Sequence, residues 1–365
     1  MTLISRAPRV EASVLDDGLV PRLHQELEEF LAHAPDTAPE VGGALADLVL
    51  AGGKRVRPTF AWWGWRAAGG PVEGPAADAT VRALVALELL QGCALVHDDV
   101  MDRSATRRGR PTVHTAFAAR HHRGRWAGDS RHYGDSVAVL VGDLALAWAD
   151  DALAGAGLDP AALARAREPW RAMRTEMIAG QHLDLLAGAR REESLEKALR
   201  VARLKTAAYT VERPLHLGAA LADARPELVD ALRSYGRDVG VAFQLRDDLL
   251  GVFGDTEVTG KPVGDDLREG KRTALMALAL GLARTAHRPH AARLLRDCLE
   301  GHGVSDRTVT EVGELLRDLG AVDAVEERIG SLVEQALRTV DLVEPAEPVR
   351  LALGALAAKA TERRW

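Results

Sequence analysis

The chain has 365 residues, of which 47% are hydrophobic and 27% charged, and its 47 Lys plus Arg against 53 Asp plus Glu give a formal charge of −6. This composition excludes a disordered chain, and the acidic balance without a Lys/Arg-rich block argues against a nucleic acid partner. The first 20 residues contain no signal-peptide core, no 18 consecutive residues are apolar, and two cysteines make no disulfide framework. We therefore expect a cytoplasmic protein without a membrane span.

Helix-forming residues dominate the chain, because Ala, Leu, Arg and Glu are abundant and aromatic residues are only 4%. The predicted helices, in chain order, are 20–34, 42–51, 58–68, 77–101, 136–154, 160–187, 193–222, 226–252, 272–283, 288–299, 306–318, 321–342 and 347–362. Gly, Pro, Asp or Ser residues occupy the breaks between them. We expect a flexible tail at 1–15 and a single domain at 16–365, with the polar segment 119–135 poorly ordered.

The predicted helix at 77–101 is apolar almost all round and ends in carboxylates at Asp98, Asp99 and Asp102. Residues three and four apart share a helix face, so these like charges repel one another unless a cation lies between them. Magnesium typically takes one or two carboxylates and bridges to substrate phosphates. A basic run at 107–112 follows, which favours a magnesium–diphosphate site over a merely solvated helix end.

A second, later apolar helix carries Asp247 and Asp248 near its end, and basic residues follow glycines in three places. These places are the run GGKRVR at 52–57, Lys261 and Lys271. Arginine binds phosphate with a planar fork and lysine acts as a point charge. A single Gly-Lys pair is more often a turn with a solvated lysine, so each place alone is only a candidate phosphate contact.

The ordered motifs GGKRVRP, LVHDDVMD, RRGRPT, LKT, FQLRDDLLGVFGD and TGKPVGDDLREGKRT resemble the trans-isoprenyl diphosphate synthases, the polyprenyl synthetase family, over about residues 40 to 285. With the segment HYGDSVAVLVGDLALAWAD they look most like the actinobacterial geranylgeranyl diphosphate synthases. The resemblance implies an all-α isoprenoid synthase-type bundle of antiparallel helices around a deep central cavity, usually in a homodimer. It also implies a prenyltransferase that condenses isopentenyl diphosphate with dimethylallyl, geranyl or farnesyl diphosphate.

The resemblance also implies roles for individual residues. It implies three Mg²⁺ ions bound by Asp98, Asp102 and Asp247, with Asp99 and Asp248 in support. The residues implied to act on the allylic substrate are Arg107, Lys205, Gln244 and Lys261 at its diphosphate, Lys271 nearby and Thr206 beside the developing cation. Those implied to bind isopentenyl diphosphate are Lys54, Arg57 and Arg108, and Gln91 is a further substrate-binding residue.

The chain departs from the family pattern at two positions. Gln91 stands where many members carry histidine, and its amide still offers a hydrogen-bond donor. The second aspartate motif ends in Gly251 instead of a third aspartate, and Asp255 lies too far along the chain to replace it on the same turn. We expect this departure to be tolerated, because Asp247 is the direct ligand.

The residues before Asp98 are expected to measure the product. One helical turn rises about 5.4 Å, close to the length of one isoprene unit, so the first bulky side chain along the cavity acts as a ruler. The side chains expected to line this wall are Ala94, Cys93, Leu89 and Leu90, with Leu87 beyond them. Family members that stop at C15 commonly have aromatic residues at the first two of these positions, so a C20 product is expected and C25 or longer stays open.

Three other functions fit less well. A class I terpene synthase would leave the basic residues around Lys54 and Arg108 without a second diphosphate to bind. A phosphohydrolase using His97 and Asp98 would need further histidines on nearby helices, and a silent subunit would usually lack an aspartate motif. The side chains left with two open roles, lining the cavity or pairing in the core, are Asp143, Gln181 and Asp184.

Overall fold

The computed structural model describes residues 17–34, 38–107, 109–254, 263–300 and 304–361. Its elements, in chain order, are α2 (Leu19–His33), α3 (Pro39–Leu50), α4 (Val56–Ala67), α5 (Pro75–Met101), β1 (Thr106–Arg107), β2 (Arg110–Pro111), α6 (Val113–Arg123), α7 (Ser130–Ala154), α8 (Pro160–Ala189), α9 (Leu195–Val201), the π-helix η1 (Ala202–Glu212), α10 (Arg213–Leu221), α11 (Pro226–Phe253), α13 (Asp265–Arg268), α14 (Ala274–Thr285), α15 (Pro289–Leu299), α16 (Asp306–Asp318), α17 (Ala321–Asp341) and α18 (Glu347–Thr361). The predicted tail at 1–15 lies outside the described residues, and the single domain stays a prediction.

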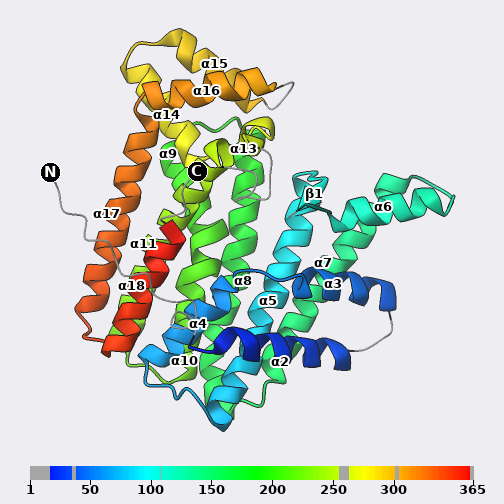
Figure 1. The fold of residues 1–365 in the computed structure, drawn as a ribbon, viewed down its shortest axis with the longest axis vertical. Coiled ribbons are helices and arrows are strands. Elements are labelled where there is room, and N and C mark those ends of the chain that lie inside the picture. Colours follow the sequence, from blue (N-terminus) through cyan, green and yellow to red (C-terminus); the bar gives the residue numbers. More distant parts are fainter. Residues whose placement is uncertain (1–16, 35–37, 108, 255–262, 301–303, 362–365) are drawn as a thin grey trace.

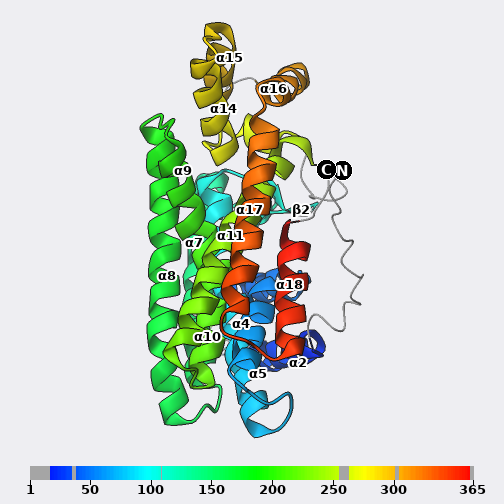
Figure 2. The same ribbon diagram turned by 90° about the vertical axis from the view of Figure 1, so that its left-hand side faces the viewer.

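The long helices α5, α7, α8, α11 and α17 run along one common direction and form the body of the molecule (Figures 1 and 2). α5 packs on α7, and η1 lies between α8 and α11. α2 and α3 cross this bundle on one side, while α15 and α16 cover one end of it (Figure 1). The all-α fold is therefore confirmed. The sequence pattern did not predict the short antiparallel hairpin of β1 and β2, whose strands have two residues each.

α5 is the central element of the largest hydrophobic cluster among the described residues, to which α2, α3, α4, α7 and α8 also contribute. Its side chains are buried around nearly the whole circumference, which explains why the sequence pattern has no polar stripe. By length and composition α5 could cross a membrane, but 78% of its most apolar window is buried in the protein. That burial is typical of a core helix.

The prediction of one continuous α-helix at 193–222 is wrong, because the π-helix η1 separates the α-helices α9 and α10. A π-helix is wider than an α-helix, so its neighbours must leave room. A Cβ atom at Gly180 of α8 would lie 2.2 Å from the backbone nitrogen of Lys205, and one at Gly240 of α11 would lie 2.6 Å from the Ala207 Cα. Glycines on both flanking helices therefore let η1 fit between them.

The prediction of poor order over 119–135 is also wrong, because α6 and the first turn of α7 occupy most of this segment. Three aromatic rings hold the turn between these helices, with centroid distances of 5.7 Å from His121 to Trp126 and 5.4 Å from Trp126 to Tyr133. The Asp129 carboxylate accepts a hydrogen bond from the His132 nitrogen at 2.7 Å and caps α7. Side-chain packing here outweighs the polar, glycine-rich composition.

Candidate active site

The two aspartate motifs lie at the ends of α5 and α11 that point toward the same end of the bundle, near β1 and α13 (Figure 1). The Asp98 carboxylate on α5 meets side chains from two other helices. It accepts hydrogen bonds from Gln181 Nε2 of α8 at 3.0 Å and from Lys205 Nζ of η1 at 3.1 Å. The Lys205 ammonium also lies 2.7 Å from the Asp184 carboxylate of α8. Gln181 and Asp184 are thus part of the site.

The charges in this cluster perturb one another. Burial alone would raise the pKa of Asp98, but the ammonium groups of Lys205 and Lys271 hold it below its usual value. Burial and the neighbouring Asp98 charge raise the pKa of Asp102 to about 6. Burial would lower the pKa of Lys205, yet the carboxylates of Asp98 and Asp184 raise it above its usual value. The two lysines stand where positive charge is needed between like carboxylates.

Asp99 has a different role from its two neighbours. It is 3% exposed, and its carboxylate pairs with Arg107 of β1, whose Nη2 lies 2.7 Å from Oδ1. Arg107 Nε donates to both Asp99 oxygens, at 2.9 and 3.1 Å. A bidentate pair of this kind fixes the guanidinium plane. Asp99 therefore holds Arg107 at the edge of the site, 3.8 Å from the Asp98 carboxylate.

Lys271 connects the first aspartate motif to the segment after the second one. Its Nζ lies 3.5 Å from Asp102, 3.5 Å from Asp266 and 2.7 Å from Glu269. A Cβ atom at Gly251 would lie 1.9 Å from Asp266 Oδ2. The Asp266 carboxylate therefore fills the space in which a third aspartate side chain would begin, which gives a physical reason for the glycine.

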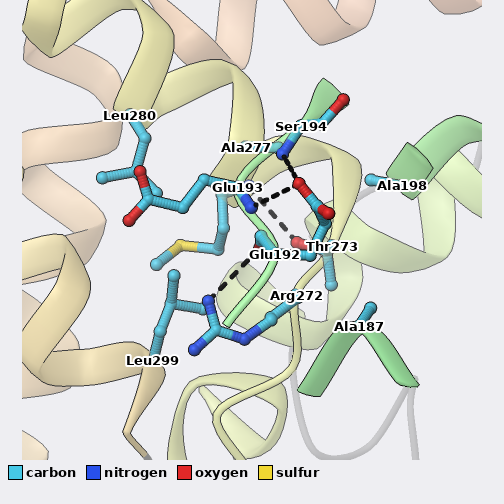
Figure 3. A pocket seen from close by; sticks show the side chains of 11 residues that line it. Ala187, Glu192, Glu193, Ser194, Ala198, Arg272, Thr273, Ala277, Leu280 and Leu299 are labelled. Atoms are coloured by element: carbon cyan, nitrogen blue, oxygen red, sulfur yellow. Dashed lines mark hydrogen bonds between the residues drawn. The ribbon is translucent and has the colours of Figure 1, made fainter. Parts of the chain in front are cut away.

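Arg272, the neighbour of Lys271, is anchored on the far side of this segment. Figure 3 shows its guanidinium beside Glu192, whose backbone oxygen accepts from Arg272 Nη1 at 3.2 Å. The Glu192 carboxylate accepts in turn from the Ser194 nitrogen at 3.1 Å, just before α9. The cavity at this point measures about 10 Å³, too small for a substrate. Its walls serve to hold the segment that carries Lys271.

The second motif is linked to η1 through side chains. Thr206 Oγ1 donates to Gln244 Oε1 at 2.5 Å, and Gln244 Nε2 donates to Asp248 Oδ1 at 2.8 Å. Asp248 Oδ2 accepts from the Ala274 nitrogen at 3.1 Å, at the start of α14. Burial raises the pKa of Asp248 to about 7. Asp248 therefore supports the site from behind, while the half-buried Asp247 is the more accessible of the two.

A second group of side chains lies on α4, α5 and the later half of η1. Arg57 Nη2 donates to Thr210 Oγ1 at 2.8 Å, and its Cζ lies 4.1 Å from the centroid of the Tyr209 ring. The Tyr209 hydroxyl donates to Gln91 Oε1 at 2.8 Å. Lys54 is exposed on the adjacent loop. We call Arg57, Gln91, Tyr209 and Thr210 the arginine end, and Asp98, Asp102, Asp184, Lys205 and Lys271 the aspartate end.

The donor set of the aspartate end fits a hard divalent cation. Asp98 and Asp102 present carboxylates one helical turn apart, and their mutual repulsion appears in the raised pKa of Asp102. Within the described ranges no three His, Cys, Asp or Glu side chains converge into a ready metal cluster. This sparse set suits Mg²⁺, which keeps waters and shares phosphate oxygens as ligands.

The side chains expected to measure the product differ in their surroundings. Leu89 and Leu90 are fully buried in the main hydrophobic cluster, and Ala94 is only partly buried. Cys93 is 3% exposed, with its sulfur 3.7 Å from His97 Nδ1, and burial raises its pKa to about 12. That thiol is a core residue and no nucleophile.

Two expected residues, Arg108 and Lys261, lie outside the described residues. Four residues that the sequence reasoning missed lie at the site, and they are Tyr209, Thr210, Asp266 and Glu269. Tyr209 and Thr210 follow the LKT motif, but their sequence gives no signal of a role at the site, because buried tyrosine and threonine side chains are common in a helical core.

Comparisons with known proteins show what this chain is similar to as a whole. The polyprenyl synthetase family model matches residues 39–315. A geranylfarnesyl diphosphate synthase of Aeropyrum pernix is 33% identical over 84% of this chain and 88% of its own length, and a (2E,6E)-farnesyl diphosphate synthase of Mycobacterium bovis is 36% identical over 72% and 67%. A crystal structure of geranylgeranyl pyrophosphate synthase from Corynebacterium glutamicum, complexed with isoprenyl diphosphate and magnesium, is 47% identical and superposes with a TM-score of 0.90 over 97% of this chain and 100% of that one.

Proposed function

Because this chain belongs to the polyprenyl synthetase family, it is a trans-prenyl diphosphate synthase, and we propose that its main product is geranylgeranyl diphosphate (C20). Its substrates are isoprenoid diphosphates, and the reaction uses a divalent metal. The observation that carries the assignment of two substrate subsites is the position of η1. Lys205 of this helix contacts Asp98 in the aspartate end, whereas its Tyr209 and Thr210 contact Gln91 and Arg57 in the arginine end.

In this proposal the aspartate end receives the allylic diphosphate. Three Mg²⁺ ions would be held by Asp98, Asp102 and Asp247, and bound metal supplies positive charge to the departing diphosphate. Lys205 and Lys271 keep their ammonium groups beside the same carboxylates, which stabilises the leaving group as its charge develops. Lys261 and the Asp99-supported Arg107 complete this set as further expected contacts of the diphosphate.

Thr206 and Gln244 belong to the same subsite. The Thr206 hydroxyl donates its hydrogen to Gln244 Oε1, so its oxygen lone pairs are left for a positively charged neighbour. An allylic cation forming beside this hydroxyl would meet them. This orientation supports the expected role of Thr206 near the developing cation.

The arginine end is proposed to bind isopentenyl diphosphate. Arg57 and Lys54, with Arg108 of the following basic run, supply positive charge, and Gln91 adds an amide donor. The isopentenyl double bond attacks C1 of the allylic cation after the bond from C1 to oxygen has broken. Loss of a proton to the released diphosphate restores a double bond. Apolar helices around the site exclude water, which would convert the cation to an alcohol.

The helical positions of the α5 side chains indicate which of them can limit the length of the product. Ala94 lies four residues before Asp98, about 40° from it around the helix, and Leu87 lies eleven residues before it, about 20° away. Leu89 lies nine residues before Asp98, about half a turn away on the opposite side of the helix. Ala94 and Leu87 are therefore the better candidates for the wall, with Leu90, Cys93 and Leu89 behind it.

A C25 product is the second candidate. The small side chain at Ala94 offers no barrier one turn from Asp98, and the Aeropyrum pernix relative is named a geranylfarnesyl diphosphate synthase. The chain-length difference then depends on whether Leu87 blocks the cavity.

We also propose a homodimer in the cytoplasm. On α7, Val139 and Leu140 are 44% and 56% exposed, and an apolar face of this kind is suited to a second copy. The cysteines Cys93 and Cys298 are both free and buried, which fits a reducing compartment. Light scattering of the purified chain measures the mass of the assembly.

Product analysis tests the function. The purified protein is incubated with Mg²⁺, isopentenyl diphosphate and each allylic starter, and the dephosphorylated products are sorted by length. We expect a dominant C20 alcohol that disappears on chelation. A dominant C25 alcohol would keep the chemistry and discard the C20 ruler, whereas diphosphate release without elongation would contradict the two-substrate reaction.

A further inference from the structure

Arg57 is held in an unusual way for a cationic side chain. Its guanidinium lies over the Tyr209 ring, with Cζ 4.1 Å from the centroid, and Nη2 donates to the Thr210 hydroxyl at 2.8 Å. Both partners are electrically neutral and come from η1, and Thr210 is 153 positions away in the chain. Arg57 Nε is buried and has no hydrogen-bond partner among the described residues. Within the part of the chain that the structure describes, two neutral groups hold this guanidinium and no carboxylate pairs with it.

We propose that Tyr209 and Thr210 are positioning residues that orient the Arg57 guanidinium for the diphosphate of isopentenyl diphosphate. This inference rests on the proposed function of Arg57. A planar guanidinium binds a phosphate with two parallel hydrogen bonds only when its plane is correctly turned. A ring face and a hydroxyl set that plane while leaving the positive charge for the substrate.

The positioning pair is itself rigid. Thr210 is 1% exposed and Tyr209 is 8% exposed, so neither side chain is free to turn away. The Tyr209 hydroxyl donates to Gln91 Oε1 at 2.8 Å, which leaves the Gln91 amide nitrogen as a donor for the substrate. One tyrosine therefore orients two of the groups proposed to meet the same diphosphate.

The same π-helix carries Lys205 at the other subsite, and close contact at Gly240 fixes its path along α11. The spacing between Lys205 and Thr210 therefore sets the distance between the groups that meet the two diphosphates. A carboxylate in place of Thr210 would hold Arg57 equally firmly, but it would compete with the substrate for the charge. The neutral hydroxyl avoids that competition.

The test compares two substitutions at one position. Thr210→Val keeps the shape and removes the hydroxyl, and we expect the KM for isopentenyl diphosphate to rise about 10-fold, the effect of one lost hydrogen bond to a charged group. The kcat and the KM for the allylic substrate should change less than about twofold. Thr210→Ser keeps the hydroxyl, so its KM for isopentenyl diphosphate should stay within about twofold of that of the unsubstituted protein.

The ring of Tyr209 provides a second test of the positioning role. Tyr209→Leu removes both the ring face under Arg57 and the hydroxyl that donates to Gln91, and it should raise the same KM at least about 10-fold, the size of a desolvated cation–π contact alone. This variant decides the question if Thr210→Val does not fold, as judged by its melting temperature. An unchanged KM for isopentenyl diphosphate in the folded variant would overturn the inference, as would a rise that affects both substrates equally.

A control separates this inference from the function on which it rests. If Arg57→Ala leaves the KM for isopentenyl diphosphate unchanged, the proposed role of Arg57 is wrong. If Arg57→Ala raises it and Thr210→Val does not, only the positioning role is wrong. In the Arg57→Ala background, Thr210→Val should have no further effect, and additive effects in the double variant would contradict positioning through Arg57.

Discussion

The aspartate end and the arginine end of the site hold their charged groups in opposite ways. At the aspartate end Lys205 lies between Asp98 and Asp184, and Lys271 lies near three carboxylates, so each ammonium is already neutralised by the protein. At the arginine end the contacts recorded for Arg57 within the described residues are an aromatic ring and a hydroxyl. One end is a network of ion pairs and the other is a cation on a neutral support.

This difference indicates how each end meets its substrate. Carboxylates paired with lysines must exchange partners when a metal and a diphosphate arrive, so binding there depends on added cations. The Arg57 support needs no such exchange, because neither neutral partner cancels its charge. We infer that the allylic diphosphate requires metal, whereas isopentenyl diphosphate is bound by side chains alone.

The largest expected effect comes from breaking the aspartate end. Asp98→Asn keeps the size of the side chain and removes the charge that pairs with Lys205. We expect kcat to fall about 1,000-fold, because a principal electrostatic contact of the departing diphosphate is lost. Steady-state turnover at saturating Mg²⁺ measures this. A loss below about 10-fold would show that Asp98 is no ligand, and a matched change at the distant surface residue Asp318 serves as the control.

Breaking the arginine end should affect one substrate only. For Arg57→Ala we expect the KM for isopentenyl diphosphate to rise about 100-fold, the usual consequence of truncating one partner of a hydrogen-bonded charge pair. The KM for the allylic substrate should stay within about twofold. If both constants rise together, the separation of the two ends is incorrect.

A substitution at Asp248 tests whether this residue is a direct metal ligand, and its expected effect is smaller. Asp248 accepts from the Ala274 nitrogen at the start of α14 and from Gln244, and burial raises its pKa to about 7, so its carboxyl is largely protonated below that pH. Asp248→Asn imitates the protonated form and keeps an oxygen acceptor. We therefore expect kcat to fall less than about 10-fold, far less than the loss in Asp98→Asn. Equal losses in the two variants would make Asp248 a direct ligand.

The smallest effect on turnover is expected from a change at Ala94, which is proposed to limit the length of the product. Ala94→Phe places an aromatic ring one helical turn from Asp98, on the partly exposed face of α5. The main product should shorten from C20 to C15 while total turnover changes less than about threefold. Product chromatography measures the distribution, and Gly281→Ala, which meets no atom within 4 Å on α14, is a neutral comparison. An unchanged distribution removes Ala94 from the wall.

The helical fold was predictable where the apolar pattern is strong. α5 and α11 follow from long apolar runs, and the aspartate motifs lie inside the last turns of both helices. α6 was missed because its stability comes from packing on α7 and from the ring contacts of His121, which a local pattern does not contain. The π-helix was missed because its apolar spacing looks like that of an α-helix, and the glycines that admit it lie on other helices.

The site was predictable where motifs name charged residues. The pairing of Lys205 with Asp98 joins two motifs that the sequence analysis had placed in one site. Tyr209 and Thr210 were missed because a buried tyrosine and threonine look like core residues until Arg57 is seen against them. Asp266 was missed because its place beside Gly251 depends on the packing of α13 against α11, which a local sequence pattern does not contain.

The most direct test of the division between the two ends is a binding measurement with and without metal. Calorimetry would record the affinity of the purified protein for isopentenyl diphosphate and for an unreactive thio analogue of an allylic diphosphate, each in Mg²⁺ and in a chelator. The account predicts that chelation abolishes binding of the allylic analogue and changes the affinity for isopentenyl diphosphate less than about threefold. Equal loss of both affinities on chelation would contradict it.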